Sequence, residues 1–178
     1  LVETEELWYA AETTVMTELG ADWGPEHQAA LVGGPLELAV SYMVEHAGGT
    51  HDHDDVMRRL LVVMESLLRS EPVNWRPGAK DLLVSLEAAG VPCALVSASW
   101  RNLVDAVVDA VLHEVGSEAF RTTVAGDEVE RTKPFPDPYL LAADRIGVRP
   151  QDCVVLEDSH TGTRAGVASG ALVVAEMP

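Results

Sequence analysis

Two adjacent carboxylates, Glu157 and Asp158, follow the short apolar run Cys153–Leu156 and precede residues typical of a helix start. A short apolar run bounded by polar residues predicts a strand that is buried on both faces. In parallel sheets, ligands lie beyond the carboxyl ends of such strands, and carboxylate oxygens are ligands that Mg²⁺ prefers. A pair of acids is also the ordinary charge of a helix N-terminus, so the pair alone does not establish a metal site.

Two further polar residues end or follow other predicted strands. Ser97 closes the run "CALVSA", and Lys133 lies in "RTKPFPDP", the loop that follows "TTVAG". Taken singly, a terminal Ser is ordinarily a helix cap and a loop Lys is ordinarily solvated. A hydroxyl, an ammonium and a carboxylate pair on one edge of a sheet are, however, the groups that a magnesium-assisted phosphoryl site requires. We therefore predict a phosphoryl site at this edge.

The elements that must position these residues alternate between helix and strand after the "NWRPG" turn at residues 74–78. We expect strands in "PCALVSA", "FRTTVAG", "CVVLE" and "ALVVA". We expect helices in "AKDLLVSLEAAG", "RNLVDAVVDAVLHEV", "DPYLLAADRIG" and "TGTRAGVASG". This alternation predicts an α/β fold with a parallel sheet and crossover helices.

The chain from Glu3 to about Arg69 has helical periodicity throughout. Its turn residues divide it into three expected helices: "ETEELWYAAETTVMTELG", "PLELAVSYMVEHAGG" and "DDVMRRLLVVMESLLRS". The third helix should have Asp54 or Asp55 as its N-cap. An all-helical unit therefore precedes the sheet.

Composition limits the classes of function. The 178 residues, 47% of them hydrophobic, suffice for one full core with room for a smaller insertion. A formal net charge of −17 disfavours nucleic-acid and anionic-membrane partners. No apolar stretch reaches the length of a membrane span and no leader opens the chain, so we expect a cytoplasmic protein. Cys93 and Cys153 lie in apolar runs, which predicts buried free thiols.

The segments "ALVSAS", "RTKPFPDPY" and "VVLEDSHTG" resemble the second, third and fourth motifs of the haloacid dehalogenase-like (HAD) hydrolase superfamily. The resemblance is to the branch that contains β-phosphoglucomutase and many sugar-phosphate phosphatases, and it extends over essentially the whole chain. It implies a Rossmann-like three-layer core with an inserted all-helical cap. Residues 1–3 would begin the core, residues 4–73 would form the cap, and residues 74–178 would continue the core.

The resemblance also implies roles for the polar residues at the sheet edge. Ser97 and Lys133 would be catalytic: Ser97, with the backbone N–H of Ala98, would hold phosphoryl oxygens at a helix N-terminus, and Lys133 would neutralise charge on the nucleophile and the transferring group. Asp158 would bind Mg²⁺ directly, and Glu157 directly or through water. Mg²⁺ is thus the expected cofactor.

Substrate contacts would come from both units. Ala98 ends the run "CALVSA", and Ser99 and Arg101 follow it. Gly33 and Gly34 lie in the cap loop "VGGPLE", where they would approach the substrate when the cap closes. Arg101 is equally typical of a solvated residue at a helix start. The partner that these residues imply is a small phosphorylated molecule.

The first motif of the family is not found in the 178 residues. That motif is a strand ending in Asp-x-Asp-Gly-Thr, in which the first Asp is the nucleophile and the second the general acid/base, and a segment very like "LVETEELW" follows it. We therefore expect the sequence to be a fragment of a longer polypeptide. Its end, "ALVVAEMP", also looks cut short of a final strand and helix.

The activity that the resemblance implies is Mg²⁺-dependent hydrolysis of a small phosphorylated metabolite, such as a sugar phosphate, through an aspartyl-phosphate intermediate. Two alternatives stay open. A β-phosphoglucomutase-like phosphotransferase is disfavoured because mutase-like members carry a His and an Arg where this chain has Trp8 and Leu36. A noncatalytic binding protein is the other alternative, if the Asp motif is truly absent.

Overall fold

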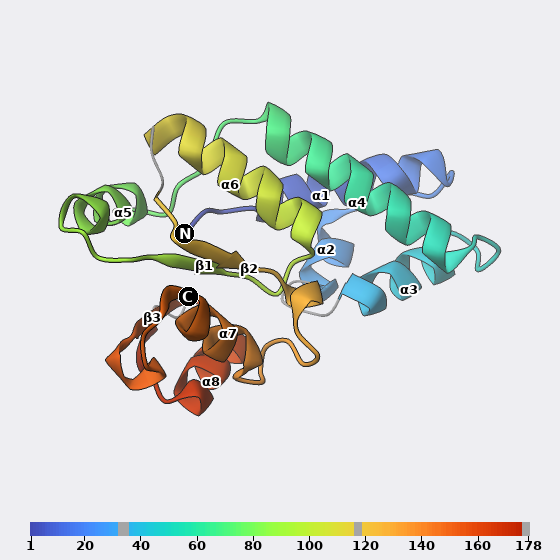
Figure 1. The fold of residues 1–178 in the computed structure, drawn as a ribbon. Coiled ribbons are helices and arrows are strands. Elements are labelled where there is room, and N and C mark those ends of the chain that lie inside the picture. Colours follow the sequence, from blue (N-terminus) through green and yellow to red (C-terminus); the bar gives the residue numbers. More distant parts are fainter. Residues whose placement is uncertain (32–35, 116–118, 176–178) are drawn as a thin grey trace. The chain divides into compact units, whose positions relative to one another are not determined.

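The computed structural model describes residues 1–31, 36–115 and 119–175 (Figure 1). Its α-helices and strands are, in chain order, α1 (Glu5–Glu18), α2 (Pro25–Leu31), α3 (Leu36–His46), α4 (His53–Ser70), α5 (Ala79–Ala88), β1 (Ala94–Val96), α6 (Arg101–Val115), β2 (Thr122–Val124), α7 (Asp137–Ile146), β3 (Val154–Glu157), α8 (His160–Ser169) and β4 (Leu172–Ala175). Two short 3₁₀ helices, η1 (Gly126–Glu128) and η2 (Pro150–Asp152), join them. The chain divides into two compact units, Leu1–Arg76 and Pro77–Pro178.

The core of the first unit lies where α1, α3 and α4 pack together. Helix α4 is the longest of the described helices and runs beside α1 (Figure 1). Its apolar residues recur every three or four positions and are buried; they are Val56, Met57, Leu60, Leu61, Val63, Met64 and Leu68. Met16 of α1 and Met43 of α3 are also fully buried. Burial of this apolar stripe therefore holds the helical unit together.

Two features of the helical unit differ from the prediction. The N-cap of α4 is Asp52, whose Oδ1 accepts the backbone N–H of Asp55 at 3.0 Å, so the predicted caps Asp54 and Asp55 instead lie in the first turn. Helix α2 was not predicted. None of its seven residues is buried, so it carries no apolar period that could reveal it.

The first residues of the chain pair with the end of the helical unit. Val2 forms an antiparallel bridge with Trp75, and the N–H of Glu3 donates to the carbonyl of Asn74 at 2.7 Å. The guanidinium of Arg76 binds the carboxylate of Glu3 at 2.6 Å. Residues at the two ends of this unit are thus tied side by side.

The second unit contains the four predicted strands. Strands β1 and β2 pair in parallel, with Leu95 opposite Thr123, and β3 and β4 pair in parallel, with Leu156 opposite Val174. We predicted one parallel sheet, whereas the described residues form two separate two-stranded sheets. The reason is that no described strand lies between β1 and β3 to supply the hydrogen bonds that would join them.

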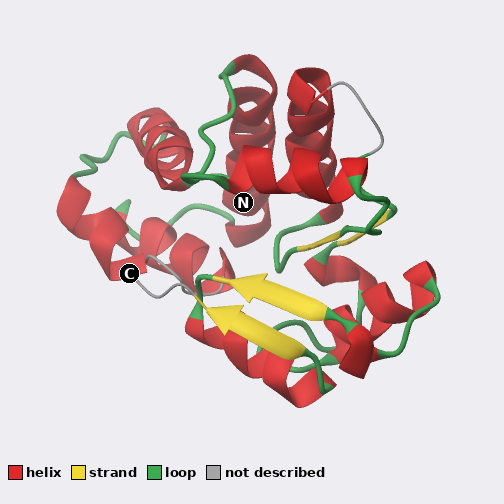
Figure 2. Ribbon diagram, turned by 90° about the vertical axis from the view of Figure 1, so that its left-hand side faces the viewer, coloured by secondary structure: helices red, strands yellow, loops and turns green. Residues whose placement is uncertain are grey.

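Helices cover the strands unequally. Helix α8 packs against β3 and β4, and α7 packs against β1, β2 and α8. Gly166 permits the close approach of α8, because a Cβ there would come within 2.9 Å of Val173 and 3.1 Å of Val155. Figure 2 shows a pair of parallel strands with helices against one face. The other face of β3 and β4 exposes four apolar side chains: Val154, Leu156, Leu172 and Val174.

The composition predicted buried free thiols and no membrane-spanning segment. Cys93 and Cys153 are free thiols, but they are half-buried rather than buried, because each lies just before its strand begins. Burial raises the pKa of both thiols. Among the helices in the described part of the chain, none is long and apolar enough to cross a membrane.

Glu12 is a buried acid in the core of the helical unit. Glu12 is only 5% exposed, and one of its carboxylate oxygens accepts the indole N–H of Trp23 at 3.1 Å. Burial raises the pKa of Glu12, and the hydrogen bond from Trp23 offsets this only in part. The charged form of Glu12 therefore opposes folding.

Glu12→Gln is accordingly expected to raise the free energy of unfolding at pH 7, because the amide oxygen still accepts from Trp23 and no charge is buried. An acid whose pKa is raised by folding costs stability only above its ordinary value of 4.5, so the gain should shrink as the pH falls toward 4.5. Urea unfolding between pH 8 and pH 5 measures both effects. Glu6→Gln, an exposed position on the same helix, is the control, and equal effects of the two substitutions would contradict the prediction.

Candidate active site

The ammonium group of Lys133 joins the carboxyl ends of two strands. Its Nζ donates to the carbonyl oxygen of Val96, the last residue of β1, at 3.0 Å and to Oε1 of Glu157, the last residue of β3, at 2.5 Å. The two charged side chains are 9% and 7% exposed. Lys133 and Glu157, predicted from separate motifs, therefore lie together, and Ser97 directly follows Val96.

Two hydroxyl groups complete the surroundings of the Glu157 carboxylate. The hydroxyl of Tyr139, at the start of α7, donates to Oε1, and the hydroxyl of Ser159 donates to Oε2 at 2.9 Å. The ammonium of Lys133 also lies over the Tyr139 ring, 5.1 Å from its centroid. Both carboxylate oxygens of Glu157 are thus hydrogen-bonded.

These contacts determine the protonation states of Glu157 and Tyr139. Burial by itself would raise the pKa of Glu157, but the charge and hydrogen bond of Lys133 and the two hydroxyl donors outweigh it, so this pKa lies below its ordinary value. Burial raises the pKa of Tyr139, and its hydrogen bond to Glu157 raises it further. At neutral pH Glu157 is therefore an anion and Tyr139 a neutral donor.

The first turn of α8 packs against the Glu157 carboxylate. Ser159 is the N-cap of α8: its Oγ accepts the N–H of Gly162 at 3.0 Å while its hydroxyl donates to Glu157. Any residue larger than glycine at position 162 would force neighbouring atoms to shift, because its Cβ would lie 2.0 Å from the Glu157 carboxylate. The "EDSHTG" sequence thus places the end of β3 and the first turn of α8 around one side chain.

Asp158 differs from its neighbour Glu157 in exposure. It follows β3 directly and is exposed, whereas Glu157 is buried among donors. In the described ranges, no group of three or more His, Cys, Asp or Glu residues could hold a metal ion. Mg²⁺ suits a site of one or two carboxylates, since it usually keeps several waters and shares the oxygens of a substrate phosphate. The donor set of Asp158 and Glu157 fits that kind of site.

The predicted phosphoryl-binding residues form one turn between β1 and α6. The N–H of Ser97 extends the β1–β2 ladder by donating to Val124 at 2.9 Å, and its Oγ accepts the N–H of Ser99 at 3.1 Å. Ala98 is exposed. Helix α6, of 15 residues, begins at Arg101, two positions after Ser99. Backbone N–H groups at a helix N-terminus attract anions, so this turn is suited to a phosphate.

The remaining predicted residues do not join this group. The guanidinium of Arg101 donates to Asp105 at 2.9 Å, to the Thr123 hydroxyl at 2.8 Å and to Glu128. Its partners in the structure are thus protein groups on α6, β2 and η1, and its contact with a substrate stays a prediction. Gly33 and Gly34 lie outside the described residues.

Sequence reasoning missed Tyr139, Ser159 and Gly162. Tyr139 lies in helix α7, six residues after Lys133, which lies in the preceding loop. The apolar periodicity of this helix indicates only that Tyr139 belongs to the core. Ser159 carries a usable signal, because a Ser between a strand and a helical segment is typical of a helix N-cap, whereas Gly162 carries none. That signal indicates the cap but not its bond to Glu157.

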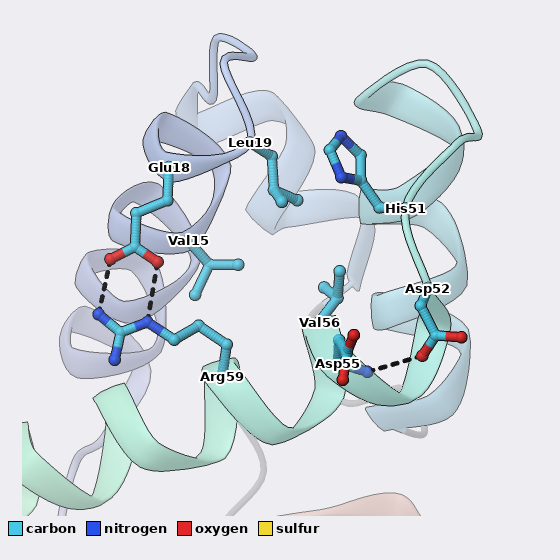
Figure 3. Close-up of a pocket in the computed structure, with 8 residues that line it drawn as sticks. All are labelled: Val15, Glu18, Leu19, His51, Asp52, Asp55, Val56 and Arg59. Atoms are coloured by element: carbon cyan, nitrogen blue, oxygen red, sulfur yellow. Dashed lines mark hydrogen bonds and ion pairs between the residues drawn. The ribbon is translucent and has the colours of Figure 1, made fainter.

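A cavity of about 230 Å³ lies in the helical unit, between α1, the loop before α4 and the start of α4 (Figure 3). None of the predicted site residues lines it. Its polar groups bind one another: Arg59 forms two hydrogen bonds to Glu18, at 2.8 and 2.6 Å, and Asp52 caps α4. This cavity is therefore separate from the candidate active site.

Comparison with known proteins gives matches over most of the chain. A family model described as "Haloacid dehalogenase-like hydrolase" matches residues 1–175. The "Probable pseudouridine-5'-phosphatase" of Drosophila melanogaster is 32% identical over 179 residues, covering 98% of this chain and 76% of that protein. The "Bifunctional riboflavin kinase/FMN phosphatase" of Arabidopsis thaliana is 43% identical over 105 residues, covering 59% of this chain but spanning only 27% of the relative.

Solved structures agree with these matches. CbbY from Rhodobacter sphaeroides, crystallised in complex with phosphate, is 28% identical and superposes with a TM-score of 0.85, covering 100% of this chain and 82% of that one. A mutant of that protein in complex with xylulose-(1,5)bisphosphate gives a TM-score of 0.84 with the same identity and coverage. This chain therefore has the same α/β fold as CbbY.

Tyr139→Phe is expected to lower the free energy of unfolding by about 1.5–3 kcal/mol at neutral pH, because it removes a hydrogen bond to a buried anion. The lowered pKa of Glu157 stabilises the fold above its ordinary value of 4.5, and that contribution is lost as the pH falls further. The deficit of the variant should therefore shrink below pH 4.5. Chemical unfolding on both sides of this pH measures it.

The control for this substitution is Tyr9→Phe on α1. Within the described part of the chain the Tyr9 hydroxyl makes no hydrogen bond, so its removal should change stability little. A deficit for Tyr139→Phe that is no larger than the control, or that stays constant with pH, would show that the hydroxyl does not stabilise the Glu157 anion.

Proposed function

The chain belongs to the family of haloacid dehalogenase-like hydrolases, and on that premise we propose that it is a Mg²⁺-dependent phosphatase that hydrolyses a small phosphorylated metabolite, such as a sugar phosphate. The observation that carries the proposal is the buried ammonium of Lys133, held at the ends of β1 and β3 beside the Ser97 turn. A fixed cation next to a helix N-terminus is suited to binding a phosphoryl dianion in a site with little water.

The Ser97 turn would bind the phosphoryl oxygens. Because Ser97 Oγ already accepts from the N–H of Ser99, its own hydrogen can be donated to a phosphoryl oxygen. The backbone N–H of Ala98 would add a second donor, and Lys133 would balance the charge that develops during transfer. These roles are those that the motifs predicted for Ser97, Ala98 and Lys133.

Mg²⁺ would be held by Asp158 directly and by Glu157 through water. This division follows from burial, since both oxygens of Glu157 accept protein hydrogen bonds whereas Asp158 is exposed. Phosphatases of this family generally use Mg²⁺. When bound, the ion neutralises negative charge on the phosphoryl oxygens.

The reaction also needs a carboxylate nucleophile. Each of β1 and β3 has one open edge among the described strands, and Lys133 holds their carboxyl ends together. A parallel strand that paired with both edges would end beside this ammonium, and we propose that an Asp-x-Asp-Gly-Thr segment ends there. Its first Asp would attack phosphorus, and the P–O bond to the substrate would break as the second Asp protonates the leaving oxygen to give the alcohol. Water would then hydrolyse the aspartyl-phosphate.

The names of relatives support the class of substrate. Those reported above are phosphatases of small phosphorylated molecules, or were crystallised with phosphate or a sugar bisphosphate. We propose that the helical unit acts as the cap, that Gly33 and Gly34 belong to its substrate loop, which Leu36 follows at the start of α3, and that the protein works in the cytoplasm. Its partner would be a phosphorylated metabolite rather than a nucleic acid or membrane.

Lys133→Met in the full polypeptide is expected to lower kcat for p-nitrophenyl phosphate by about a hundredfold or more, because a preorganised cation is lost. Lys80→Met, which removes an exposed ammonium paired with Glu114 on the same unit, should leave kcat unchanged. A chelator should abolish turnover, and Mg²⁺ should restore it.

Circular dichroism checks that the Lys133 variant is folded, because it leaves a buried carboxylate without its cation. Ser97→Ala keeps that ion pair and gives a second measurement, with kcat expected to fall. Normal kcat in both site variants, or turnover that persists in chelator, would overturn the proposed activity.

A further inference from the structure

The turn after β2 is fixed to the turn after β1 by two hydrogen bonds, one between main-chain groups and one from a main-chain N–H to a side chain. The N–H of Gly126 donates to the carbonyl of Ser99 at 2.8 Å, and the carboxylate of Asp127 accepts the N–H of Arg101, the first residue of α6, at 2.9 Å. The approach is close, because a Cβ at Gly126 would lie 2.2 Å from the carbonyl oxygen of Ala98. Movement of residues 125–128 would therefore move the predicted phosphoryl-binding turn.

One carboxylate, that of Glu128, anchors the turn after β2. It accepts the backbone N–H of Ala125 at 2.7 Å, a guanidinium N–H of Arg145 at 2.9 Å and a guanidinium N–H of Arg101. The side chain of Glu128 is 26% exposed. Burial by itself would raise the pKa of Glu128, but its N–H donors lower it to about 2. The carboxylate is therefore charged at any pH at which the protein would be assayed.

Strand β2 holds the same two arginines. Arg101 donates to the hydroxyl of Thr123 at 2.8 Å, and Arg145 donates to its carbonyl at 2.7 Å. Helix α6, helix α7 and strand β2 are thus joined around Glu128. An isolated exposed ion pair contributes little, but this carboxylate is shared by two arginines and a backbone N–H.

We propose that Glu128 is a positioning residue of the active site, which acts through Arg101 and residues 125–127 to hold the Ser97–Ser99 turn in its phosphoryl-binding shape. This inference rests on the proposed function, since it gives that turn the task of binding phosphate. Without the Glu128 charge, the two guanidinium groups repel each other and the hydrogen bonds that Glu128 accepts are weakened. The donors of the turn are then no longer fixed relative to Lys133.

Glu128→Gln tests this role with little change of shape. The expected results are a rise of about tenfold or more in amide hydrogen exchange at residues 97–101, and a loss of about tenfold or more in affinity for inorganic phosphate, measured as a competitive inhibitor. Asp152→Asn is the matched control, because Asp152 forms two hydrogen bonds with Arg149, at 2.8 and 3.0 Å, on the same unit but at η2. It should change neither quantity.

Arg145→Gln provides a second variant that keeps the Arg101–Glu128 contact, and both effects should have the same direction and a smaller size. Unchanged exchange at residues 97–101 in both variants would overturn the positioning role, as would increased exchange with unchanged phosphate affinity. If the unsubstituted protein neither binds phosphate nor hydrolyses phosphomonoesters, the proposed function fails; the exchange measurement then still decides separately whether Glu128 orders the turn.

Discussion

The Lys133 ammonium occupies the point at which the carboxyl ends of β1 and β3 come together. It is nearly buried, and it bonds a main-chain carbonyl of one two-stranded sheet and a carboxylate of the other. A buried charge is tolerated only when it is paired and hydrogen-bonded, so Lys133 and Glu157 each require the other. The Ser97 turn and the exposed Asp158 owe their common location to this pair.

Much of the second unit could be predicted from the sequence because its signals are local. Four short apolar runs and the helices between them predict the strands, and the rule that ligands lie at the carboxyl ends of parallel strands brings Ser97, Lys133 and Glu157 to one edge. The bond of Tyr139 to Glu157 and the engagement of Arg101 by Glu128 could not be predicted, because they depend on how α6 and α7 lie against the strands. Helix α2 could not be predicted either, because none of its residues is buried and it therefore has no apolar periodicity.

The structure gives the two adjacent acids of "LEDS" unlike tasks. Glu157 is enclosed by Lys133, Tyr139 and Ser159, which favours its charged form and orients the ammonium. Asp158 is exposed at the edge where a metal ion and a phosphate would lie. A hydrogen-bonded carboxylate next to an exposed one preorganises the charges of the site before a substrate binds. The Glu128 network extends the same logic to the turn after β1.

A double-mutant cycle on Lys133→Met and Glu157→Gln tests most directly whether this ion pair organises the site. Each single variant should lower the free energy of unfolding by about 3–5 kcal/mol, because it leaves a buried polar or charged group without its partner. The double variant should be destabilised by less than the sum of the two, with a coupling of about 1–3 kcal/mol. Additive effects would contradict the account, because they would mean that Lys133 and Glu157 stabilise the protein independently and that their contact does not hold the strand ends together.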